Sequence, residues 1–369
     1  MSKVIFKRTS YNYKTLKPIL FEMIAALGED LISKQDRVLI KPNLLMPAKP
    51  ENAVITHPFV VRAVAEYVLS KGGIPMIFDS PATGSIEKIK VEGGYYKAFR
   101  GLDVEVKEFS RSIKVNIGEP FGSIEIAREV FEVDVIINLP KLKTHTGMLL
   151  TLGVKNLFGC IVGLKKPDWH LRSGIDREMF ARLLVQICHA VNPSITIADG
   201  ILAMEGQGPG KRGIPRPLGI LVGGRDVFAV DMAICTVLGL DPKELLTHKT
   251  AKKLRLTSNE VYVDGDLNIV NDFKFPELKP LICGPKQLHK FMRKHMIQRP
   301  EIEDLLCNLC GECWQYCPAK AITCSNEKID FDYDICIRCY CCMEICPHGA
   351  LYAIEPFPAR IMRRLSLLN

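Results

Sequence analysis

Short apolar runs and segments with helical periodicity alternate along the first 275 or so residues of the chain. The apolar runs are rich in Val, Ile and Leu and are typical of buried strands; they lie at residues 3–7, 37–40, 74–78, 133–139, 195–198, 218–222 and 261–263. Residues 15–31 carry apolar side chains at helical spacing, and a second helix is expected from His57-Pro58 to Gly72-Gly73, with Thr56 as its N-cap. This alternation predicts an α/β fold with a largely parallel sheet flanked by helices.

The chain changes character after residue 278, which we take as the end of the α/β domain. Residues 279–300 are rich in Lys and Arg and predict a basic linker helix, whose charge either docks an acidic redox partner or simply faces water. Residues 301–356 form a cysteine-rich module, expected to be a small α+β domain. Residues 357–369 form a basic tail with apolar positions, expected to pack as a helix on its own protein; contact with a membrane surface is the alternative.

The cysteine-rich module contains two copies of one motif. Each copy has the pattern Cys-x2-Cys-x2-Cys-x3-Cys-Pro, the spacing of bacterial ferredoxins with two [4Fe–4S] clusters, in which the fourth cysteine of each run binds the other cluster. The predicted ligands are therefore Cys307, Cys310, Cys313 and Cys346 for one cluster, and Cys336, Cys339, Cys342 and Cys317 for the other. A structural zinc site uses two separated Cys-x2-Cys pairs and fits this duplication poorly. Cys324 and Cys341 are surplus, and we expect free thiols, with Cys341 an alternative ligand.

Composition indicates where such a protein works. The chain has 369 residues, enough for an ordinary core without disulfides, and ten of its 14 cysteines lie between Cys307 and Cys346 at metal-ligand spacing, which indicates a reducing compartment. We see no signal-peptide pattern and no apolar stretch long enough for a membrane span, so we expect a cytoplasmic protein. The formal charge of +8 would fall to about +4 with two clusters bound, and no basic stripe indicates nucleic-acid binding.

Polar residues gather just after the predicted strands. In an open parallel sheet, ligands bind outside the carboxyl ends of the strands, and lysines there suggest an anionic substrate such as a carboxylate or phosphate. We predict substrate binding by Lys41, Asn43, Lys141, Lys155 and Asn156. Lys143 and His145 are the predicted catalytic residues, with His145 as proton donor because histidine titrates near neutral pH. The alternative is that these loop side chains simply face water.

Glycines crowd residues 206–213 without matching a known phosphate loop. The pattern is neither a Walker A motif nor a dinucleotide fingerprint, because Lys211 is followed by Arg212 and Pro209 interrupts the glycines. We predict a mobile flap for this segment.

Several segments together resemble a known family. They lie at residues 41–43, 56–58, 138–145, 151–159, 199–200, 206–213 and 226–231. They are similar to the family catalogued as domain of unknown function 362, over about residues 1–275, and members of that family often carry a C-terminal ferredoxin module. The resemblance implies a redox association. It implies no reaction and no catalytic residues.

Two functional hypotheses follow from these observations. In the first, the protein is a ferredoxin-dependent reductase that passes electrons from a redox partner, a ferredoxin or a reductase, through two [4Fe–4S] clusters to an anionic small molecule at the α/β domain. In the second, it is a non-catalytic electron-transfer or cofactor-maturation protein whose α/β domain binds a protein partner. A buried polar pocket at the strand ends would favour the first hypothesis, and a flat apolar rim would favour the second.

Overall fold

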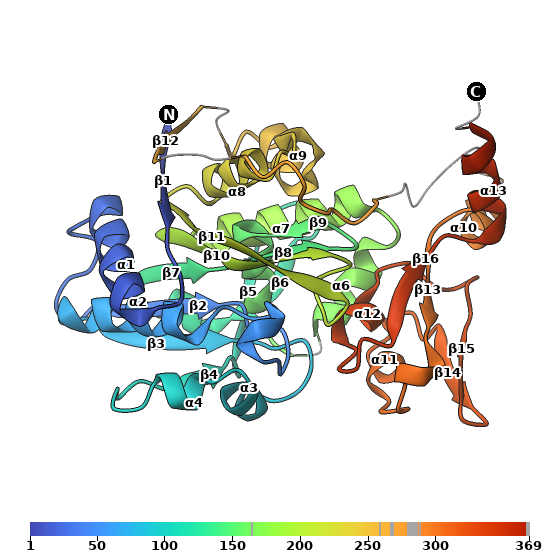
Figure 1. Cartoon of the computed structure of the whole chain (residues 1–369), viewed down its shortest axis with the longest axis horizontal. Coiled ribbons are helices and arrows are strands. Elements are labelled where there is room, and N and C mark those ends of the chain that lie inside the picture. Colours follow the sequence, from blue (N-terminus) through green and yellow to red (C-terminus); the bar gives the residue numbers. More distant parts are fainter. Residues whose placement is uncertain (164, 258–259, 266–268, 279–286, 288, 367–369) are drawn as a thin grey trace.

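The computed structural model describes residues 1–369 except 164, 258–259, 266–268, 279–286, 288 and 367–369. A large body built around one sheet carries a smaller C-terminal module beside α6 (Lys165–Ser173) (Figure 1). Most of the predicted linker helix falls outside the described residues, and its described part is α10 (His289–His295). No helix in the described part of the chain is long and apolar enough to cross a membrane.

The body is organised by a ten-stranded sheet with the order β12-β1-β11-β10-β7-β2-β3-β4, from which β8 and β9 branch at β10. Its strands are β1 (Ser2–Arg8), β2 (Arg37–Pro42), β3 (Ile74–Asp79), β4 (Val106–Glu108), β7 (Val135–Leu139), β8 (Lys141–His145), β9 (Leu149–Thr151), β10 (Ile195–Gly206), β11 (Gly213–Gly224) and β12 (Val261–Asp264). The run from β10 through β7, β2 and β3 to β4 is parallel, whereas β11 is antiparallel to both β1 and β10. The predicted α/β class with a largely parallel sheet is confirmed.

Helices cover both faces of this sheet because strand side chains alternate between the faces. Val38 and Ile40 of β2 share a core with Leu16 of α1 (Tyr13–Leu27) and with α2 (Pro58–Ser70). Leu39, between them, packs instead with Leu184 of α7 (Arg177–Val191). The remaining helices of the body are α3 (Ile86–Glu92), α4 (Tyr95–Ala98), α5 (Gly153–Asn156), α6, α8 (Val227–Val237) and α9 (Leu246–Lys253).

The helix predicted from residue 57 has a different cap from the one expected. His57 is the N-cap residue of α2, and its Nδ1 accepts a hydrogen bond from the Phe59 N–H at 3.2 Å. Thr56 is used elsewhere, because its hydroxyl accepts from the Asn43 N–H and donates to the Leu139 carbonyl. Thr56 therefore joins the ends of β2 and β7 instead of capping a helix.

The C-terminal module is a small α+β unit with two short antiparallel strand pairs. Strand β13 (Arg299–Ile302) pairs with β16 (Leu351–Ile354), and β14 (Ile322–Ser325) pairs with β15 (Lys328–Phe331). One short helix lies in each cysteine run, α11 (Glu312–Gln315) in the first and α12 (Cys341–Ile345) in the second. Helix α13 (Phe357–Ser366) follows and contacts α10.

The glycine-rich segment is the tip of the β10–β11 hairpin, and it packs against the C-terminal module. A Cβ atom on Gly210 would lie 2.8 Å from the Glu344 carbonyl oxygen, so only glycine allows this approach. Arg212 forms an ion pair with Glu303, and the Ala353 N–H donates to Gln207. The expectation of a free flap is wrong, since the tip joins the two parts of the molecule.

Replacing Gly210 with alanine should loosen this contact. The new methyl group would overlap the α12 backbone, and overpacking of this kind destabilises by roughly 1–3 kcal/mol. We expect the C-terminal module of Gly210→Ala to be cleaved faster by protease, and thermal unfolding to begin at a lower temperature. Ile214→Ala is the control, because Ile214 is exposed on the same hairpin. Native protease resistance in Gly210→Ala would contradict the close contact.

Candidate functional site

Four cysteines from both runs surround one cavity in the C-terminal module. Its empty space, counted together with open solvent, is about 300 Å³, and its cysteines are Cys307, Cys310, Cys313 and Cys346. The other set is grouped in the same crossed way, since Cys339 and Cys336 are near enough to Cys317 to raise the pKa of its thiol, as its burial does. This grouping is compatible with crossed ligation, which stays a prediction.

Backbone N–H groups point at cysteine sulfurs in both runs. The Ala321 N–H donates to Cys317 Sγ and the Ala350 N–H to Cys346 Sγ, each at 3.3 Å. Such bonds stabilise the charge of ligating thiolates. Among the described residues, no three His, Cys, Asp or Glu side chains converge closely enough to hold a single metal ion. Four thiols around a cavity, with donors at their sulfurs, fit a [4Fe–4S] cluster.

A second cavity lies between the module and the carboxyl ends of the strands. Its empty space, counted together with the open solvent at its mouth, is about 630 Å³. Its polar lining from the body consists of Lys41, Asn43, Asp79, Ser80, Lys143, Thr151, Lys155, Asn156, Lys166 and His170. The module contributes Tyr316, Cys341, Glu344 and Ile345. Because Tyr316 precedes Cys317 and Cys341 precedes Cys342, the second set of cysteines is next to this pocket.

A row of asparagines holds the strand ends around Lys143. The Lys143 ammonium donates to Asn43 Oδ1 at 2.8 Å and to the Val54 carbonyl at 2.6 Å. Asn43 donates to Asn156 Oδ1, and Asn156 donates to Asn138 Oδ1 at 2.7 Å. Burial lowers the pKa of Lys143 to about 7. Lys143 can therefore exchange a proton near neutral pH, and one of its three donors is left for the pocket.

Two further lysines of the pocket are held by partners of the body. Lys41 forms a buried ion pair with Asp79 Oδ1 at 2.6 Å, and Asp79 Oδ2 accepts the Leu44 N–H. Lys166 of α6 donates to the carbonyl and the hydroxyl of Ser80, at 2.6 and 2.9 Å. Burial lowers the pKa of Lys166 to about 8. These contacts keep cationic groups at the pocket wall.

Two pocket groups have no partner within the described part of the chain. Among the described residues, Lys155 donates no hydrogen bond and joins no ion pair, although its side chain is only 9% exposed. The buried Thr151 hydroxyl is also without a hydrogen-bond partner in this part of the chain. Burial would raise the pKa of Glu344, but the charge of Lys155 and the contact with His145 bring it well below its usual value. An ammonium and a hydroxyl are thus available to a ligand.

Lys141 and His145 are buried on β8 outside this pocket. Lys141 donates to Asp199 Oδ2 and to the Tyr11 hydroxyl, both at 2.8 Å, and so forms part of the core. His145 Nδ1 accepts the Gly147 N–H, which leaves Nε2 as the protonated nitrogen, 3.5 Å from Glu344 Oε2. Burial lowers the pKa of His145 to about 4. Of the seven predicted residues, the pocket brings together Lys41, Asn43, Lys143, Lys155 and Asn156.

Sequence reasoning missed pocket residues that come from distant segments. Asp79 and Ser80 follow a predicted strand, and the strand-end rule places them at this edge, although they were not among the predicted binding residues. Lys166 and His170 are one turn apart on α6, at a spacing that places both side chains on one face. Nothing in the sequence indicated three residues from the module, because their position depends on how the module docks; they are Tyr316, Cys341 and Glu344.

Comparison with known proteins agrees with this arrangement. A model of the domain of unknown function DUF362 matches residues 38–236, and a model of the 4Fe-4S dicluster domain matches residues 299–347. The thylakoid-associated protein sll1697 of Synechocystis sp. (strain ATCC 27184 / PCC 6803 / Kazusa) is 36% identical over 303 residues, which cover 80% of this chain and 94% of that protein. This chain belongs to the DUF362 family.

The ferredoxin part of this DUF362 protein has a separate relative. Pyruvate synthase subunit PorD of Methanocaldococcus jannaschii is 37% identical over 58 residues, which cover 15% of this chain and 67% of that subunit. The two family models confirm the predicted fusion, and with this relative they support an iron–sulfur electron-transfer protein with a ferredoxin-like module.

Crossed ligation predicts which cluster a single substitution damages. Cys317→Ser and Cys336→Ser should weaken the same cluster, because both cysteines belong to one sulfur set, while the cluster of Cys307 stays intact. EPR spectra of the anaerobically reconstituted variants test this. Cys324→Ser is the control, since Cys324 is exposed and belongs to neither set. Loss of different clusters in the first two variants would show that ligation is not crossed.

Proposed function

We propose that this DUF362 protein is an iron–sulfur reductase that binds two [4Fe–4S] clusters and reduces an anionic small molecule in the pocket between its two parts. The observation that carries the proposal is the composition of that pocket. Four lysines of the body face residues adjacent to the cysteines Cys317 and Cys342. The clusters, held by the two cysteine sets, would supply one-electron chemistry at the pocket wall.

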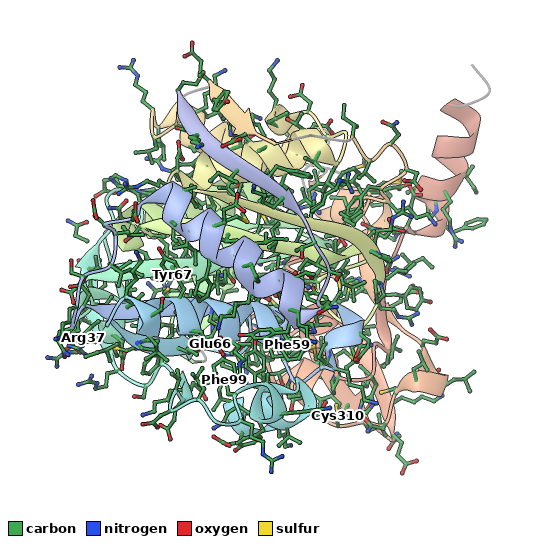
Figure 2. All side chains as sticks on the ribbon, turned by 60° about the vertical axis from the view of Figure 1, so that its left-hand side comes forward. Arg37, Phe59, Glu66, Tyr67, Phe99 and Cys310 are labelled. Atoms are coloured by element: carbon green, nitrogen blue, oxygen red, sulfur yellow. The ribbon has the colours of Figure 1, made fainter. Side chains whose placement is uncertain are left out.

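The two cysteine sets have different surroundings, which suits electron entry and exit at opposite ends. Cys310 is exposed, on the surface of the C-terminal module in Figure 2. Nearby Leu305 is 96% exposed and Leu309 is 36% exposed. An apolar surface beside a cluster suits a transient electron-donor protein. This side would receive electrons from the redox partner, and the opposite side would serve the pocket.

The charges of the pocket suit an anion. The pocket is lined by four lysines and only two carboxylates: Lys41, Lys143, Lys155 and Lys166, with Asp79 and Glu344. Lys155, which has no hydrogen-bond or ion-pair partner among the described residues, would take the anionic group directly, with the Thr151 hydroxyl as a second donor. Lys143 would give the proton that accompanies each electron, since burial brings its pKa to about 7. His145 would act through Glu344, which it contacts, and not on the substrate itself.

The second hypothesis, a non-catalytic protein whose α/β domain binds a protein partner, has less support. It calls for a flat apolar rim at the strand ends, whereas this rim is a pocket with buried lysines. The match to the pyruvate synthase subunit is confined to 58 residues, so it supports electron transfer and not pyruvate as substrate. We therefore keep the reductase as the proposed function.

Removing the charge of Lys155 should weaken anion binding without affecting the clusters. A lost charge-assisted contact costs roughly 1.5–3 kcal/mol, or about ten- to a hundredfold in affinity. We expect Lys155→Met to lose this much affinity for oxalate, a minimal anionic probe, in anaerobic calorimetry. The iron content should stay at about eight per chain. Lys165→Met is the control, because Lys165 pairs with Glu125 outside the pocket.

The same variants test the reductase proposal. Protein reduced with dithionite and freed of excess reductant is mixed with a panel of small carboxylates and phosphate esters, and recovery of the visible absorbance is followed. A substrate should reoxidise the native protein and the Lys165→Met variant quickly, and the Lys155→Met variant slowly. Equal reoxidation rates in all three proteins for every compound would rule out reduction in this pocket. An oxalate affinity that is the same in Lys155→Met as in the native protein would also rule it out.

Anion affinity should depend on pH through Lys143. Because burial lowers the pKa of this lysine from 10.5 to about 7, its ammonium is charged below pH 7 and neutral above it. Oxalate stays a dianion between pH 6 and pH 9, so its affinity should fall by roughly tenfold or more as the pH rises through 7. In Lys143→Met the fall near pH 7 should be absent, and only a decrease near pH 8 should remain, because Lys166 of the same pocket loses its charge there. A steep fall through pH 7 that survives in Lys143→Met would assign the titration to another group.

A further inference from the structure

The two cysteine runs have the same backbone conformation at one loop position and carry very different side chains there. Each run begins with Cys-x-x-Cys, and the residue just before its second cysteine is Leu309 in one run and Arg338 in the other. Both have left-handed backbones, with φ of 57° and 59°. Leu309 is 36% exposed, whereas Arg338 is 1% exposed. The same loop position thus holds an apolar side chain at the surface in one run and a buried guanidinium in the other.

Arg338 is held beside two cysteines of the pocket-side set. Its Nη1 donates to the Cys336 carbonyl at 3.2 Å. Its guanidinium lies 5.1 Å from the centre of the Tyr333 ring, a cation–π contact, and the Tyr333 hydroxyl is fixed by the Pro300 carbonyl. Arg338 and Cys339 line one cavity at the boundary with the body. The charge is therefore permanent and localised, because an arginine does not lose its proton in proteins.

A fixed positive charge in this place stabilises the reduced form of a cluster. Reduction adds a negative charge, and a buried cation is screened much less than one in water. Backbone hydrogen bonds to sulfur have the same effect, and both sets have them. Cys317 and Cys346 each accept one at 3.3 Å, and Cys307 accepts another from the Leu309 N–H at 3.4 Å. Within the loop between the first two cysteines, the two runs differ in charge only at this position, Leu309 against Arg338.

We propose that Arg338 sets the reduction potential of the cluster bound by Cys336, Cys339, Cys342 and Cys317. Its buried charge raises that potential, which makes the pocket side the favoured position for an electron. Arg338 acts through the cluster and touches no substrate, so it is a tuning residue and not a catalytic one. The inference rests on the two-cluster part of the proposed function and is independent of the substrate.

Potentiometric titration of the anaerobically reconstituted full-length protein, followed by EPR, tests the proposal without any substrate. Arg338→Leu gives the second run the side chain of the first. We expect it to move one of the two midpoint potentials to a more negative value and leave the other in place. Arg338→Lys keeps the charge and should stay close to the native potentials. Leu309→Ala is the matched control and should change neither.

The identity of the shifted cluster is checked with Cys317→Ser, which should remove the signal that Arg338→Leu shifts. Native potentials in Arg338→Leu with both clusters present would overturn the proposal, as would a shift confined to the cluster of Cys307. If Arg338→Leu loses its cluster, Arg338→Gln replaces it in the test, because glutamine is neutral but keeps an amide donor. Arg338→Gln must then show the same negative shift in potential. A native potential in Arg338→Gln would also overturn the proposal. An iron content near four in the native protein would contradict the two-cluster proposal itself, so the two failures are distinguishable.

Discussion

Burial of lysine ammonium groups at the carboxyl ends of the strands is the constraint on which the rest of the structure depends. Lys41, Lys141 and Lys143 are each at most 1% exposed. A buried charge is tolerated only where partners replace its water. Lys41 pairs with Asp79, and Lys141 contacts Asp199 and Tyr11. Lys143 donates to Asn43 and to a backbone carbonyl.

These partners also hold the strand ends together. Asp199 accepts from Lys141 of β8, from Tyr11 near the N-terminus and from the His57 N–H at the start of α2. Burial would raise the pKa of Asp199, but the charge and hydrogen bond of Lys141 keep it below its usual value. One carboxylate therefore joins three segments far apart in the chain. Removing it would leave Lys141 buried without a counter-charge, which is more costly than a missing surface pair.

The pocket itself is a product of docking. The body contributes its cations, and the module closes the site with Tyr316, Cys341 and Glu344. The hairpin tip at Gly210 lies against the backbone of α12, the helix that carries Cys341 and Glu344. The same contact therefore positions the pocket wall and the second cysteine set. The ferredoxin-like module and the DUF362 body thus form together a pocket that neither lines alone.

Much of this was accessible from the sequence, because it depends on local spacing. Alternating strand and helix patterns determined the α/β class, the duplicated cysteine runs indicated the cluster ligands, and the strand-end rule placed Lys41, Lys143 and Lys155 near a site. Tertiary structure alone decided that Lys141 belongs to the core, that His145 faces Glu344, and that Arg338 is buried while Leu309 is not. The physical reason is that burial and partner choice depend on segments far apart in the chain, which the spacing of residues within one segment does not encode.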